Sequence, residues 1–159
     1  MKLTLFDLDG TLLPIDSDHA FGEFMIRLGW ADAAEHRARN DRFFQDYQAG
    51  CLDMDAYVDF ATSAWRFRSA SELADASARF MAEVIVPAML PAAIGLVQRH
   101  RQQGDCLAVI TATNEFVTGP IARAFGIDSL IATELARDAR GCVTGRIRGK
   151  HQNFKLHFL

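Results

Sequence analysis

The chain has few cysteines and prolines and lacks any long run of apolar residues. Only 3 cysteines and 4 prolines occur among its 159 residues. The cysteines, Cys51, Cys106 and Cys142, are widely spaced, which argues against a disulfide framework and against a cysteine-based zinc site. No stretch approaches the roughly 18 uninterrupted apolar residues that a membrane span requires, and no basic segment precedes an apolar one at the N-terminus. We therefore expect a cytoplasmic protein that does not cross a membrane.

The chain also has no large excess of charge of either sign. The formal net charge is -3, with 17 Lys and Arg against 20 Asp and Glu. The arginines are spread among acidic residues, so the basic surface expected of a nucleic-acid-binding protein is missing. The length fits one core with a small appendage, and 50% hydrophobic residues suffice to build it. We expect no nucleic-acid partner, and the composition indicates no particular oligomeric state.

Two acidic residues follow the apolar segment at the N-terminus. Residues 3–7 predict a buried strand that ends with Asp7, and Asp9 lies two positions further on. Because strand side chains alternate, Asp7 and Asp9 can point to the same side. Isolated carboxylates are unfavourable away from water, so a shared cation or reaction chemistry best explains the pair. Gly10 permits a sharp turn after the strand, and Thr11 can hydrogen-bond locally to hold it.

A calcium-binding loop is the competing interpretation of this acidic segment. An EF-hand loop has glycine at its sixth position and a bidentate glutamate at its twelfth. Counted from Asp7, glycine occurs earlier, at Gly10, and the twelfth residue is Asp18. The spacing therefore favours a site built on the Asp7 and Asp9 pair over a calcium loop.

A block of helices is predicted between the acidic pair and the second half of the chain. Residues 17–84, called the helical block below, carry apolar and aromatic side chains at helical spacing and no strand pattern. Asp16, Ser17 and Asp18 supply N-cap chemistry for a first helix that should end at Gly29. Three further helices are expected around residues 43–47, 57–65 and 73–84. Their aromatic residues are expected to pack inside the block.

The second half of the chain predicts alternating helices and strands. The expected elements are a helix over 92–103, a strand over 106–110, a helix over 115–125, a strand over 130–133 and a hairpin over 134–147. This βαβ pattern with right-handed crossovers predicts an α/β fold with a doubly wound, Rossmann-like parallel sheet. Ligands bind beyond the carboxyl ends of such strands, so Asp7 and Thr111 should share one rim.

The segment from Phe6 to Pro14, with its Asp-x-Asp-Gly-Thr motif, resembles the haloacid dehalogenase superfamily. Together with Asp16-Ser17-Asp18 it is similar to the phosphoserine phosphatase-like branch, and Ile110–Asn114 resembles the second motif of the superfamily. The resemblance implies a core formed by residues 1–16 and 85–159, with residues 17–84 inserted as a helical cap. It implies an Mg²⁺-dependent hydrolase of a small, phosphoserine-like phosphate ester.

The resemblance also implies roles for individual residues. Asp7 would form an aspartyl-phosphate, and Asp9 would act first as general acid and then as general base. Asp7, with the backbone carbonyl of Asp9, would hold Mg²⁺, while Thr111, Thr113 and Lys150 would bind the substrate phosphate. A phosphotransferase or mutase using the same nucleophile is the alternative within this chemistry.

The end of the chain departs from the superfamily pattern. Lys150 and Lys155 are both candidates for the lysine that pairs with the phosphate, and no acidic residue follows Gly149. The Gly-Asp-x-x-x-Asp pattern that completes the magnesium site in the superfamily is therefore missing. We expect a chain truncated near Gly149 relative to the family, and a catalytically inactive remnant is a further alternative.

Overall fold

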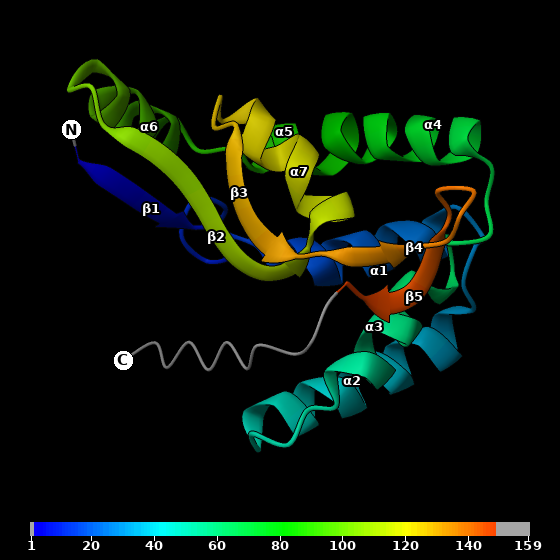
Figure 1. Ribbon diagram of the computed structural model, residues 1–159. Coiled ribbons are helices and arrows are strands. Elements are labelled where there is room, and N and C mark those ends of the chain that lie inside the picture. Colours follow the sequence, from blue (N-terminus) through cyan, green and yellow to red (C-terminus); the bar gives the residue numbers. More distant parts are fainter. Residues whose placement is uncertain (1, 149–159) are drawn as a thin grey trace.

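The computed structural model describes residues 2–148 and shows helices packed against a small parallel sheet (Figure 1). The first half contains β1 (Leu3–Asp7), α1 (Ser17–Arg27), α2 (Ala33–Gln48), α3 (Met54–Ser63), α4 (Ala70–Phe80), the π-helical η1 (Met81–Ile85) and α5 (Val86–Ala88). The second half contains α6 (Pro91–Gln102), β2 (Cys106–Asn114), α7 (Glu115–Ala124), β3 (Ser129–Thr133), β4 (Leu135–Arg137) and β5 (Val143–Ile147). The predicted order of strand, helices and alternating elements is confirmed.

The sheet has three parallel strands in the order β1-β2-β3. Asp7 lies opposite Ile110 in the register, so the carboxyl ends of β1 and β2 meet at one rim. This confirms the predicted α/β class and its parallel sheet, and over residues 2–148 the strand order advances in one direction. β2 runs four residues further than predicted, because Asn114 still pairs with Thr133 of β3 beyond an irregularity after Ile110.

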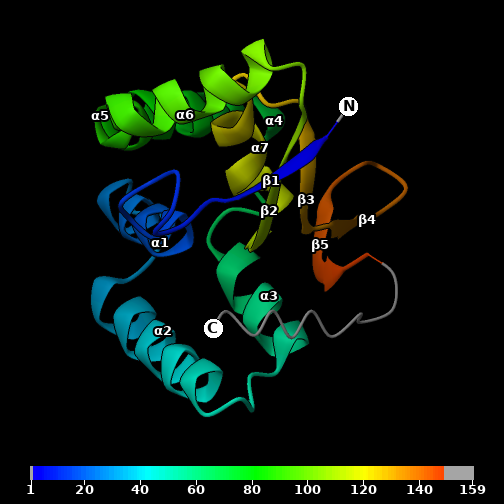
Figure 2. The same cartoon turned by 90° about the vertical axis from the view of Figure 1, so that its left-hand side faces the viewer.

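The two faces of the sheet differ in their cover. Helices α6 and α7 pack on one face, where Phe6 and Val109 are buried (Figure 2). Side chains that alternate with these point to the other face. There Leu3 and Leu5 of β1 are 67% and 47% exposed, and Ile131 of β3 is 44% exposed. Within the described residues, helices cover the sheet mainly on one side.

Aromatic residues of α1 and α4 form the core of the helical block, as predicted. The ring of Phe80 lies 5.0 Å from that of Phe21 and 5.5 Å from that of Phe24, and all three side chains are buried. The prediction was wrong for two rings of α2, since Phe44 and Tyr47 are 56% and 62% exposed. The neighbouring Phe43 contacts Tyr57 and Phe60 of α3, and a residue one position on points about 100° away around the helix.

A long helical segment leads out of the helical block toward the sheet. α4 continues through the wider turn of η1 into α5, where Pro87 cannot donate the backbone hydrogen bond of a regular α-helix. This segment runs across the predicted boundary between residues 84 and 85. Among residues 2–148 no single helix passes the length and hydropathy test for a membrane span; only Ala70–Ala88 and Pro91–Gln102 taken together do, with a 93° bend between them.

The helical block contacts the rest of the protein through Phe116, at the start of α7. Its ring stacks on Trp65 with centroids 4.2 Å apart and meets Phe21 edge-on at 5.9 Å. Trp65 is fully buried, and its indole N–H donates to the carbonyl of Ala61 at 3.0 Å. Phe116 therefore joins the end of α3, the middle of α1 and the start of α7 in one aromatic contact.

Replacing Phe116 by alanine should weaken this junction. We expect Phe116→Ala to lower the free energy of unfolding by about 2 kcal/mol or more, because it removes packing between three elements. Urea unfolding followed by circular dichroism measures the loss. Phe44→Ala is the matched control, since this ring is 56% exposed, and it should change stability by less than about 0.5 kcal/mol. Equal losses in both variants would contradict the assignment.

Candidate active site

The loop after β1 is shaped by Gly10. This residue has a φ of 73°, a conformation that glycine adopts without steric cost. The carbonyl of Leu8 accepts hydrogen bonds from the amides of Thr11 at 3.2 Å and Leu13 at 2.9 Å, which closes the loop. The Thr11 hydroxyl donates to Oδ2 of Asp7 at 2.7 Å. The roles predicted for Gly10 and Thr11 in holding the turn are confirmed.

Asp9 is held by donors from two other parts of the chain. Its Oδ1 accepts the backbone N–H of Ser17 at 2.8 Å, at the first residue of α1. Its Oδ2 accepts the hydroxyl of Thr113 at 3.1 Å, near the end of β2. A carboxylate at a helix N-terminus is favoured by the free amides and by the positive end of the helix dipole. Asp9 thus connects the β1 loop, the helical block and β2.

Thr111 and Thr113 lie at the rim where Asp7 ends β1. The Thr111 side chain is 9% exposed, and its hydroxyl accepts the backbone N–H of Thr113 at 3.2 Å. The Thr113 hydroxyl is used by Asp9, which the sequence did not predict. The structure thus brings Asp7, Asp9, Thr111 and Thr113 together, while Lys150, like Lys155, lies outside the described residues.

The environment of Asp9 favours its protonated form. Burial is the largest effect and raises the pKa of Asp9, and the negative charge of Asp16 raises it further. The hydrogen bonds from Ser17 and Thr113 act against this and lower the pKa, but the net direction is upward. A carboxyl group with a raised pKa is suited to giving and taking a proton near neutral pH.

The site also includes Asp18, an acidic residue that sequence reasoning assigned only to helix capping. Asp16 performs the capping, since its Oδ1 accepts the N–H of His19 at 2.9 Å. Asp18 instead accepts the hydroxyl of Tyr57, which belongs to α3. Loss of hydration, followed by the charges of Asp16 and Asp9, raises the pKa of Asp18 to about 7. The position of Asp18 in the first turn of the helix that follows Asp9 could have indicated that it belongs to the site. Its partner Tyr57 could not be identified from the sequence, because Tyr57 lies far along the chain.

The oxygen ligands at the rim fit a hard divalent cation. Mg²⁺ keeps several waters and is often bound by only one or two protein carboxylates, so Asp7, with the backbone carbonyl of Asp9, could hold it. Within residues 2–148 no third Asp, Glu, His or Cys completes a metal-binding group, and neither Asp7 nor Asp9 forms an ion pair there with a Lys or Arg. Among the described residues, the carboxyl oxygens of the rim therefore have no cationic side chain paired with them.

The family model of the haloacid dehalogenase-like hydrolases matches residues 4–156. The chain belongs to this family. A histidinol-phosphatase from Neisseria meningitidis serogroup C is 44% identical over 148 residues, which cover 93% of this chain and 67% of that protein. The match and this relative support the predicted class, a phosphatase of the haloacid dehalogenase type. The aligned region spans about two thirds of the length of the relatives it matches.

Solved structures of this family share the fold. A protein of unknown function from Bordetella pertussis Tohama I has a TM-score of 0.84 and 45% identity, covering 93% of this chain and 66% of that one. A phosphoserine phosphohydrolase-like protein from Francisella tularensis has a TM-score of 0.62 at 14% identity, covering 93% and 65%. The structure of a phospho-aspartyl intermediate analogue of phosphoserine phosphatase has a TM-score of 0.57 at 19% identity, covering 93% and 63%. The predicted resemblance in fold to the phosphoserine phosphatase-like branch is confirmed.

The raised pKa of Asp18 predicts a pH-dependent stability. The folded protein binds the Asp18 proton more tightly than the unfolded chain, so wild-type stability should fall as pH rises from about 4 to about 7. Asp18→Asn keeps an acceptor for Tyr57 but removes this titration. Its stability relative to wild type should therefore increase by more than about 1 kcal/mol between pH 5 and pH 8, measured by urea unfolding.

Glu23→Gln serves as the control for this experiment. Its hydrogen bond with Arg37 lowers the pKa of Glu23, which places the titration below the pH range tested. The stability difference between Glu23→Gln and wild type should stay nearly constant from pH 5 to pH 8. A difference for Asp18→Asn that is equally constant would contradict the assigned environment of Asp18.

Proposed function

We propose that the protein is an Mg²⁺-dependent phosphomonoester hydrolase that acts through an aspartyl-phosphate on a small phosphorylated metabolite. One observation carries this proposal: Asp7 ends β1 two residues before Asp9, a partly buried carboxyl with a raised pKa that is fixed by Ser17 and Thr113. The pair thus combines a nucleophile at a strand end with a proton carrier two residues away. Membership of the hydrolase family supports this reading of the pair.

In the first step, Asp7 acts as the nucleophile. One carboxylate oxygen of Asp7 attacks the phosphorus, the bond between phosphorus and the ester oxygen breaks, and the leaving oxygen takes a proton from Asp9. The Thr11 hydroxyl orients the Asp7 carboxylate through their hydrogen bond. The result is an acyl phosphate on Asp7, a free alcohol and an ionised Asp9.

In the second step, Asp9 acts as a base. It takes a proton from water, the water oxygen attacks the phosphorus, and the bond to the Asp7 oxygen breaks. Inorganic phosphate leaves, and both acids return to their starting states. The Thr113 hydroxyl can rotate to donate to the ionised carboxylate or accept from the protonated one, so it follows Asp9 through both steps.

Residues of the rim provide the remaining stabilisation. The Asp7 carboxylate and the backbone carbonyl of Asp9 would hold Mg²⁺, which when bound neutralises charge on the phosphoryl oxygens. The Thr111 hydroxyl lies at the same rim and would donate to one of these oxygens. Lys150 is the proposed phosphate-binding cation. The helical block, residues 17–84, would act as a cap over this rim and exclude water during transfer.

The substrate is proposed to be a phosphate ester of a small alcohol, phosphoserine-like as the sequence suggested. Histidinol phosphate is the first compound to assay, because a relative that is 44% identical carries the name histidinol-phosphatase. Phosphoserine and p-nitrophenyl phosphate complete the panel as a second amino-alcohol ester and a generic ester.

Replacing either acid should abolish phosphate release. With p-nitrophenyl phosphate and Mg²⁺, we expect Asp7→Asn and Asp9→Asn each to lower kcat by about 10³-fold or more, because one removes the nucleophile and the other the proton carrier. Removal of the metal with EDTA should have a similar effect that added Mg²⁺ reverses. Asp41→Asn, an exposed acid on α2, is the matched control and should keep wild-type rates.

Two results would contradict the proposed function. One is a wild-type chain without phosphatase activity toward the whole panel under these conditions. The other is an Asp7→Asn variant that releases phosphate as fast as wild type, since the acyl phosphate could then not form on this residue. Transfer of phosphate to an added alcohol, in place of release to water, would instead favour the phosphotransferase alternative.

A further inference from the structure

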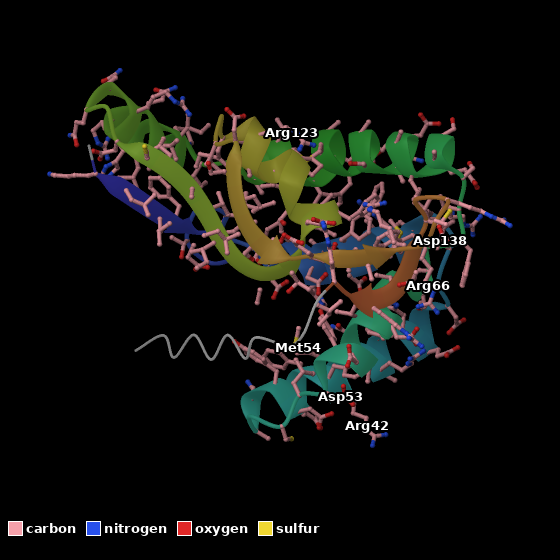
Figure 3. All side chains as sticks on the ribbon, viewed as in Figure 1. Arg42, Asp53, Met54, Arg66, Arg123 and Asp138 are labelled. Carbon is pink, nitrogen blue, oxygen red and sulfur yellow. The ribbon has the colours of Figure 1, made fainter. Side chains whose placement is uncertain are left out.

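The hairpin of β4 and β5 lies against α3 of the helical block, although the two are far apart in the sequence (Figure 3). Arg66 follows the end of α3 and lies at this contact, with its side chain 15% exposed. The strands of the hairpin are antiparallel, and the Thr144 hydroxyl donates to the carbonyl of Ala136 at 3.2 Å. An arginine from the helical block is therefore enclosed beside a separate structural element.

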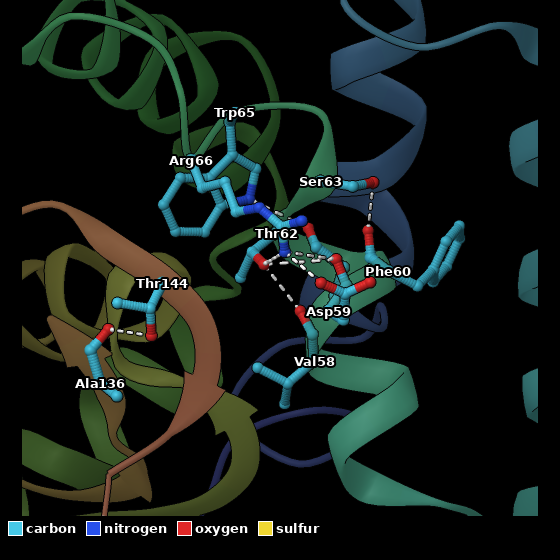
Figure 4. A network of polar contacts seen from close by, with 10 residues as sticks. Val58, Asp59, Phe60, Thr62, Ser63, Trp65, Arg66, Ala136 and Thr144 are labelled. Carbon is cyan, nitrogen blue, oxygen red and sulfur yellow. Dashed lines mark hydrogen bonds and ion pairs between the residues drawn. The ribbon is translucent and has the colours of Figure 1, made fainter. Parts of the chain in front are cut away.

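The Arg66 guanidinium is fixed to α3 by several acceptors (Figure 4). Nη1 donates to Oδ1 of Asp59 at 2.5 Å, to the carbonyl of Asp59 at 3.2 Å and to the Thr62 hydroxyl at 3.4 Å. The buried Thr62 in turn donates to the carbonyl of Val58 at 2.8 Å. A guanidinium held by a carboxylate and by carbonyl and hydroxyl oxygens has little freedom to move.

Gly145 of β5 lies directly against this guanidinium, and its lack of a side chain leaves room for it. A Cβ atom added at Gly145 would overlap the Arg66 guanidinium and come within 3.0 Å of Oδ1 of Asp59. Its φ of 79° is also a conformation that favours glycine. The Arg66 side chain thus occupies the space that any other residue at position 145 would need.

The contact is bordered by an open hollow of about 490 Å³ between α3 and the hairpin, lined by Asp55, Asp59, Thr144, Gly145 and Arg146. The lining of this hollow is polar, whereas Val58 of α3 and Leu135 and Val143 of the hairpin are buried in one hydrophobic cluster. At the edge of the hollow, the Arg66 guanidinium packs directly against Gly145.

We propose that Arg66 is a positioning residue that clamps α3 to the β4–β5 hairpin and thereby holds Tyr57 against Asp18, in the first turn of α1 and close to Asp9. α3 carries both ends of this connection, because Tyr57 lies in α3 and Asp59, the partner of Arg66, is two residues further along. If the contact between Arg66 and Gly145 is lost, α3 can shift, and Tyr57 then no longer holds Asp18 in place. This role rests on the proposed phosphatase function.

The clamp predicts a specific kinetic effect. Arg66 does not touch the rim of Asp7 and Asp9, so the chemical step should be preserved when it is changed. For p-nitrophenyl phosphate and histidinol phosphate, Arg66→Ala should raise KM about fivefold or more while kcat changes less than about twofold. Arg66→Lys, which keeps a cation opposite Asp59, should restore KM to within about twofold of wild type.

Glycine substitutions in the hairpin provide a matched pair for the same test. Gly145→Ala should reproduce Arg66→Ala, because the added Cβ displaces the guanidinium. Gly141→Ala is the control: its φ is 82° and no atom lies within 4 Å of an added Cβ, so it has the same backbone penalty without the overlap. In the double variant Arg66→Ala/Gly145→Ala the overlap is gone, so its KM should equal that of Arg66→Ala.

Hydrogen exchange tests the clamp without relying on activity. The amides of α3 should exchange about tenfold faster in Arg66→Ala and Gly145→Ala, and at wild-type rates in Gly141→Ala and in the Asp7→Asn variant. If Arg66→Ala or Gly145→Ala fails to fold, the same measurement on Arg66→Lys and Gly141→Ala decides the question. The amides of α3 should then exchange slightly faster than wild type in Arg66→Lys and at the wild-type rate in Gly141→Ala.

Three results would overturn the proposal. These are unchanged exchange in α3 for Arg66→Ala and Gly145→Ala, equal effects of Gly141→Ala and Gly145→Ala, or faster exchange without any change in KM. A wild-type chain without phosphatase activity would instead refute the proposed function, and the exchange of α3 would still decide whether Arg66 clamps the hairpin.

Discussion

The carboxylate of Asp9 is the constraint on which the architecture of the site depends. It is partly buried, and both oxygens have partners, one from the N-terminus of α1 and one near the end of β2. Satisfying this one group fixes where the helical block begins and how it sits relative to the sheet. The same partial burial raises its pKa, as the proposed role of proton carrier requires.

The arrangement around Asp9 extends outward through contacts of the helical block. Asp18 and Tyr57 join α1 to α3, Trp65 and Phe116 join the end of α3 to α7, and Arg66 packs against Gly145 of the hairpin. The contact between Asp18 and Tyr57 is polar, and the contact between Trp65 and Phe116 is aromatic. Burial is the main reason why the pKa values of Asp9 and Asp18 are raised, and the charges of neighbouring carboxylates raise them further.

The features that the sequence predicted are those fixed by local spacing. The Asp7 and Asp9 pair, the turn at Gly10 and Thr11 and the parallel α/β order all follow from neighbouring residues. The partners of Asp18 and Arg66 could not be predicted, because Tyr57 and Gly145 are distant in the chain and their contacts depend on how elements pack. The exposure of Phe44 has the same cause, since helical spacing does not tell which rings the facing helix can cover.

The central claim is that Asp7 carries the phosphoryl group. It is tested most directly by acid quenching during turnover of a phosphate ester, reduction with borohydride, and tandem mass spectrometry, because borohydride converts an acyl phosphate to an alcohol. The account predicts that Asp7 is converted to homoserine and that every other acidic residue stays unchanged. Phosphate release with Asp7 intact, or reduction at a different carboxylate, would contradict it.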